Sequence, residues 1–155
     1  MTLANGLDFL HLLATAVWIG GMLFMKLVLI PALQAVEPAQ RGRAMGVVAK
    51  RFTIVAWSSV VVLLVTGILK TPSGFLLSTE SGYGQLLLAK HLLFGAMIVV
   101  GLVITFRVAP QLRALAPAAG SPPPAALVAA EKRLEALSAI NTVLGLAVLL
   151  VVAAF

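Results

Sequence analysis

Residues 7–30 read LDFLHLLATAVWIGGMLFMKLVLI, a stretch that is apolar apart from Asp8 near its start, His11 and Lys26 near its end. A helix that crosses the hydrocarbon core of a bilayer needs about 20 mainly apolar residues, and this stretch is long enough. Three more such stretches follow, at about 52–69, 86–106 and 125–155, the last beginning with a solvated helical extension. We therefore predict an all-α integral membrane protein, a four-transmembrane-helix bundle forming a single domain over residues 1–155.

The composition supports a membrane protein and excludes several other classes. Hydrophobic residues make up 61% of the chain and charged residues 10%, with a mean hydropathy of +1.11 that a soluble domain of this length would not show. Cysteine is absent, which excludes disulfides and thiolate metal sites. The net charge of +6 lies at the ends of the apolar stretches, so it indicates orientation in a lipid bilayer rather than binding to nucleic acid.

The connections between the spans differ in charge, and this difference predicts a topology. The positive-inside rule assigns the more basic loops to the cytoplasm. It therefore places the first and third connections in the cytoplasm, and both termini on the periplasmic or extracellular side. The third connection contains a flexible, proline-rich connector at 116–124. The basic residues of these two loops are Arg41, Arg43, Lys50, Arg51, Arg107, Arg113, Lys132 and Arg133. No internal repeat is strong enough to divide the chain.

The two histidines of the chain, His11 and His91, both lie inside apolar spans. An ionisable side chain within the hydrocarbon region is costly and is therefore a hypothesis about function. Each histidine lies a few residues into a span that starts outside, so the predicted topology puts both imidazoles at a similar depth near the outer face. Two nitrogen ligands at one depth predict a site for a metal ion or for a haem. The alternative is that each imidazole only forms a structural hydrogen bond.

The neighbours of His11 along the first span supply the rest of the predicted site there. Asp8, Thr15 and Trp18 lie three, four and seven residues from His11, so all four share one stripe of the helix. Asp8 can accept a proton from one ring nitrogen and so select the nitrogen that coordinates, with Thr15 beside it. Trp18 is predicted to line the cofactor-binding region.

The third span offers fewer candidates. Gly95 lies four residues beyond His91 and leaves room for a flat ligand, while Lys90 adjoins the histidine. We include both in the predicted cofactor-binding set. The pattern identifies no catalytic residue.

Several short motifs occur in a fixed order along the first three spans. They are His11, VWIGG at 17–21, RF at 51–52, TG at 66–67 and YGQLLLAK at 83–90. In this order they resemble the copper-resistance D family of bacterial inner-membrane proteins. The resemblance implies a multi-pass protein of the bacterial inner membrane that is concerned with copper uptake or tolerance.

A weaker resemblance is to the small membrane protoporphyrinogen oxidases of bacteria. His11, Trp18 and Lys90 match positions of that family, which implies a haem b with a histidine ligand and an essential lysine. The chain departs from that family because it has no further histidine.

Three hypotheses of function follow. The first is copper handling at an intramembrane histidine site near the periplasmic face. The second is a b-type haem protein with His11 and His91 as axial ligands, serving electron transfer or a haem-dependent membrane oxidoreductase. The third is a structural or assembly subunit. A periplasmic copper or electron-transfer partner is implied by the first two, and a homodimer through Gly20 and Gly21 stays open.

Overall fold

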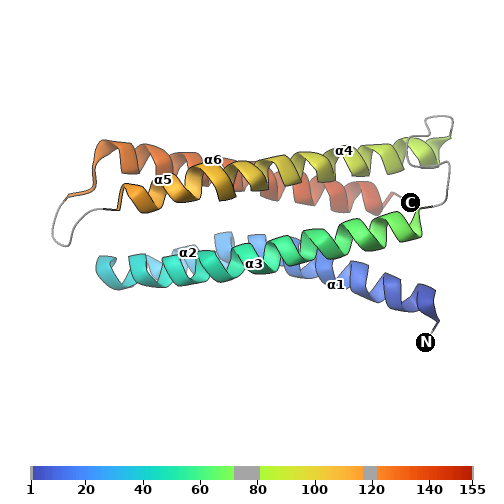
Figure 1. The fold of residues 1–155 in the computed structure, drawn as a ribbon, viewed down its shortest axis with the longest axis horizontal. Helices are drawn as coiled ribbons and strands as arrows, with labels where there is room; N and C mark the ends of the chain where they lie inside the picture. The colour runs from blue at the N-terminus through green and yellow to red at the C-terminus, as the bar shows by residue number, and fades with distance from the viewer. Residues whose placement is uncertain (1, 72–80, 117–121, 155) are drawn as a thin grey trace. The chain divides into compact units, whose positions relative to one another are not determined.

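The computed structural model describes residues 2–71, 81–116 and 122–154, and the regular structure of these residues is entirely helical (Figure 1). The chain forms two compact units, residues 1–84 and 85–155. Each unit is a pair of long helical segments joined by a connection. Most of the proline-rich connector predicted at 116–124 lies outside the described residues.

The first unit is an antiparallel helical hairpin. Its first rod consists of α1 (Leu3–Phe24), the π-helical turn η1 (Met25–Leu29) and α2 (Ile30–Leu33), and its second rod is α3 (Pro38–Lys70). The Thr2 side chain caps α1 by accepting a hydrogen bond from the backbone N–H of Asn5 at 3.3 Å. A proline in the first turn of α3 has no hydrogen bond to lose there, so it starts that helix without penalty.

The second unit is built from the same kinds of element. Its first rod consists of α4 (Gly82–Val103), η2 (Ile104–Val108) and α5 (Ala109–Ala114), and its second rod is α6 (Ala125–Val152). Val108 in η2 is fully buried, and Ala130 in α6 is 3% exposed. In this unit η2 and α5 pack against α6.

Both π-helical turns lie just before a proline, and the proline explains them. Pro31 and Pro110 each follow the last residue of a π-turn by two positions. A proline inside a helix lacks an N–H, and its ring collides with the carbonyl four residues earlier. Widening the preceding turn relieves that collision, as the bonds from Ile30 N–H to Met25 and from Ala109 N–H to Ile104 show. The first rod therefore continues to Leu33, whereas the sequence predicts an end at Pro31.

Four helices among the described residues are long and apolar enough to cross a membrane: Leu3–Leu33, Gln40–Lys70, Gly82–Ala114 and Ala125–Val152. Large apolar side chains cover their outer faces, with Leu27 69% exposed and Leu150 74% exposed. Water would penalise such a surface, whereas lipid tails would cover it. The structure confirms the all-helical class and the four apolar helices. The side of the membrane on which the termini lie stays a prediction.

The first rods of the two units also share a short sequence pattern. Residues 11–21 read HLLATAVWIGG and residues 91–101 read HLLFGAMIVVG, with the same histidine, leucine pair, alanine and final glycine. Each segment then passes through a π-turn and reaches a proline. The similarity is weak along the sequence alone, and the matching π-turns are what make it visible.

Candidate functional site

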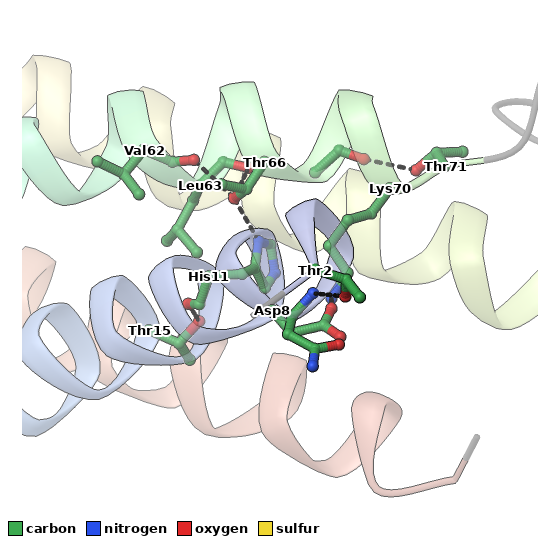
Figure 2. Close-up of polar contacts among 11 residues, drawn as sticks. Thr2, Asp8, His11, Thr15, Val62, Leu63, Thr66, Lys70 and Thr71 are labelled. Atoms are coloured by element: carbon green, nitrogen blue, oxygen red, sulfur yellow. Dashed lines mark hydrogen bonds and ion pairs between the residues drawn. The ribbon is translucent and has the colours of Figure 1, made fainter.

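His11 is held by a hydroxyl group from the opposite helix of its hairpin. Its Nδ1 lies 2.7 Å from Oγ1 of Thr66 on α3 (Figure 2). Thr66 is 2% exposed, and the imidazole is half-buried. A Cβ built at Gly67 would lie 3.9 Å from Cε1 of His11, so the backbone of α3 is also in contact with the ring.

The Thr66 hydroxyl has one hydrogen, and its position indicates the tautomer of His11. Oγ1 of Thr66 donates to the carbonyl oxygen of Val62, one turn earlier in α3, at 2.7 Å. With its hydrogen in the bond to Val62, the same oxygen is an acceptor for the imidazole, which favours the tautomer with the hydrogen on Nδ1 of His11. In a neutral imidazole this leaves the lone pair on Nε2, the nitrogen that a metal ion would bind.

Asp8 and Lys70 lie next to the His11–Thr66 pair. The Lys70 ammonium is 2.6 Å from a carboxylate oxygen of Asp8, so α1 and α3 are joined by two polar pairs (Figure 2). The side chains of Lys70 and Asp8 are 38% and 54% exposed, and such a pair contributes at most about 1 kcal/mol. The sequence predicts that Asp8 orients His11. In the structure the Asp8 carboxylate pairs with Lys70, and Nδ1 of His11 is hydrogen-bonded to Thr66. A role of Asp8 beside the imidazole stays a prediction.

The other two predicted residues of the first span lie on the same stripe of α1. Thr15 donates its hydroxyl to the carbonyl oxygen of His11 at 2.8 Å, so it contacts the backbone at His11. Trp18 is 4% exposed and packs in the interior together with Ala14 and Met22. Their participation in a cofactor site remains a prediction.

His91, Lys90 and Gly95 lie on α4 of the second unit. Nδ1 of His91 is buried and has no hydrogen-bond partner within residues 2–71, 81–116 and 122–154. Buried polar atoms without a partner are rare, so His91 stays a candidate ligand. A Cβ built at Gly95 would meet no atom within 4 Å, consistent with the space that the sequence predicts there. Lys90 is half-buried, and its function stays a prediction.

A dense metal cage is not present in the described part of the chain. Those residues contain no group of three or more histidine, cysteine, aspartate or glutamate side chains that could hold a metal ion.

Thr66 and Lys70 are the two residues that sequence reasoning missed. Thr66 appears there only as part of a family motif, and Lys70 is given no role. One signal was available, because the predicted topology puts the end of the second span at the same depth as His11. A hydroxyl in that position is a natural partner for a buried imidazole.

The structure therefore defines a helical membrane protein of four apolar helices, with one imidazole in a polar contact between two of them. The sequence profile of the family described as copper resistance protein D matches residues 46–155. The chain belongs to this family and is a multi-pass membrane protein. The matched residues include Thr66 and His91 but not His11.

Comparison with individual proteins adds little about function. A 64-residue segment is 41% identical to an uncharacterized protein of Aquifex aeolicus (strain VF5), and it covers 41% of this chain. The chain matches only 44% of the length of that relative. No solved structure shows a significant match.

Proposed function

We propose that this chain handles copper as its cargo in the bacterial inner membrane, with His11 as a ligand through Nε2. The observation that carries the proposal is the pair of hydrogen bonds at Thr66, which supports the tautomer of His11 with the hydrogen on Nδ1. Metal-binding histidines usually donate their second nitrogen to such a partner, and this raises the basicity of the coordinating nitrogen. Membership of the copper resistance protein D family supports copper as the metal.

His91 is the second ligand in this proposal. It occupies the position of His11 in the repeated HLL pattern, and its buried Nδ1 has no hydrogen-bond partner in the described segments. Imidazole nitrogen is a suitable ligand for copper, so His91 is a further candidate ligand on α4. The periplasmic side is the proposed location because it follows from the predicted topology.

The test is to measure copper bound to the purified chain and to record its visible spectrum. We compare the wild type with His11→Gln, His91→Gln and the double variant, each checked for helical content by circular dichroism. We expect copper in the wild type, a marked loss in His11→Gln, and a further loss in the double variant. The copper tolerance of host cells expressing each variant should follow the same order.

Two results would contradict the proposal. If all four proteins bind the same amount of copper, the histidines are not ligands and the structural hypothesis is favoured. If the wild type is isolated with an intense Soret band that disappears in the histidine variants, haem b rather than copper is the ligand.

A further inference from the structure

A groove of about 350 Å³ lies between the two rods of the first unit, at the end away from the His11–Thr66 pair. One wall comes from α1 and η1 and the other from α3, and almost all of the lining is apolar. The residues that matter here are Val17, Phe24, Leu29, Val48 and Val55. An apolar groove on a membrane-exposed hairpin can accommodate a hydrocarbon chain.

Arg51 is the charged residue of the lining. Its side chain is exposed, and it has no acidic partner among residues 2–71, 81–116 and 122–154. The aliphatic part of an arginine can lie along an apolar wall while its guanidinium reaches the polar region. The guanidinium also matches the geometry of a phosphate group, which it binds through two parallel hydrogen bonds.

The charge near the groove is mainly basic. A Cβ built at Gly21 would lie against the ring of Phe52, so residue 21 of α1 is level with residue 52 of α3. Lys26 is therefore on the same end of the hairpin as the start of α3, where Arg41, Arg43 and Lys50 also lie. Glu37 is the acidic residue near this end. The basic excess attracts anionic headgroups.

We propose that this groove binds an anionic phospholipid, with an acyl chain against the apolar walls and the phosphate on Arg51. Charge complementarity selects this occupant, because a zwitterionic headgroup would offer less to the basic end. A second copy of the chain is a poorer occupant, since a two-fold contact across the groove would bring Arg51 against its own counterpart. This proposal is independent of copper handling.

The experiment is native mass spectrometry of the full chain, released from detergent after addition of phosphatidylglycerol or phosphatidylcholine with identical acyl chains. We expect one phosphatidylglycerol molecule to be retained in preference to phosphatidylcholine. Arg51→Gln should weaken phosphatidylglycerol binding about fivefold, the factor for one basic residue near an anionic surface, and leave phosphatidylcholine binding unchanged. Val55→Trp fills the groove and should weaken the binding of both lipids.

Lys50→Gln is the matched control. It removes the same charge from the residue just before Arg51 in α3, and Lys50 is not in the lining. It should weaken phosphatidylglycerol binding clearly less than Arg51→Gln does. Equal losses in the two variants would mean that diffuse surface charge attracts the lipid, and this would overturn the proposal. Equal binding of the two lipids, or binding that survives Val55→Trp, would also overturn it.

Discussion

Thr66 is the residue with the greatest effect on what His11 can do. Its hydroxyl connects the imidazole to the carbonyl of Val62, so the polar groups of two membrane helices satisfy each other. This matters in lipid, where an unsatisfied polar group costs several kcal/mol. In the proposed copper site, the same contact favours the tautomer whose lone pair is on Nε2, so Thr66 would influence metal binding without contacting the metal.

Thr66→Val should weaken copper binding by about 10- to 100-fold, the usual effect of removing the hydrogen-bond partner of a metal-binding histidine. Thr66→Ser keeps the hydroxyl and should bind copper nearly as well as the wild type. The measurement is a competition titration of cuprous ion against a coloured chelator.

Thr142→Val is the matched control for that titration, because the Thr142 hydroxyl on α6 also bonds a carbonyl one turn earlier, that of Ser138. Its copper affinity should not change. An affinity that falls equally in Thr142→Val and Thr66→Val would show that loss of any buried hydroxyl disturbs the protein, and would remove Thr66 from the site.

At the scale of the elements, the close approach of α1 and α3 depends on Gly21. A Cβ at this position would lie 2.6 Å from Cε2 of Phe52, whereas a Cβ at Gly20 would meet nothing within 4 Å. Small residues let membrane helices pack closely, and here one glycine of the adjacent pair does so. The same two helices bring Thr66 to His11.

Gly21→Leu should destabilise the protein by about 1–3 kcal/mol, the usual range for overpacking a tight contact. Gly20→Leu makes the same change at an open position and should be neutral or slightly stabilising, because leucine is a better helix former than glycine. Thermal unfolding in detergent, followed by circular dichroism, measures both. The same loss of stability in the two variants would contradict the packing seen at Gly21.

The elements also show how far the sequence can be interpreted. The long apolar stretches predict the helices, because only a helix satisfies its own backbone in lipid. The π-turns before Pro31 and Pro110 are not predicted, since a proline in a helix can equally end or kink it. Whether the helix ends or continues depends on whether packing against neighbouring helices keeps the chain helical beyond the proline.

At the scale of the whole molecule, the topology of the chain is a prediction from its charges. The chain has no cysteine, so a single introduced cysteine reports its own side of the membrane. Gly6, Gly42 and Gly82 are suitable positions, because a Cβ at each would meet no atom within 4 Å.

A membrane-impermeant maleimide applied to intact spheroplasts should label Gly6→Cys and Gly82→Cys. It should label Gly42→Cys only after the membrane is permeabilised, because the basic first loop is predicted to be cytoplasmic. The reverse pattern would show that both termini are cytoplasmic, and would move His11 to the other side of the membrane.

The amino-acid sequence by itself determined the class of this protein and the number of its apolar helices. Hydropathy over about 20 residues is a local property, and a bilayer allows very few structures for such a segment. Only the tertiary structure decided which group holds His11. Thr66 is 55 residues away along the chain. The pairing depends on how α1 packs against α3, with Gly21 close to Phe52, and periodicity along either helix does not specify that packing.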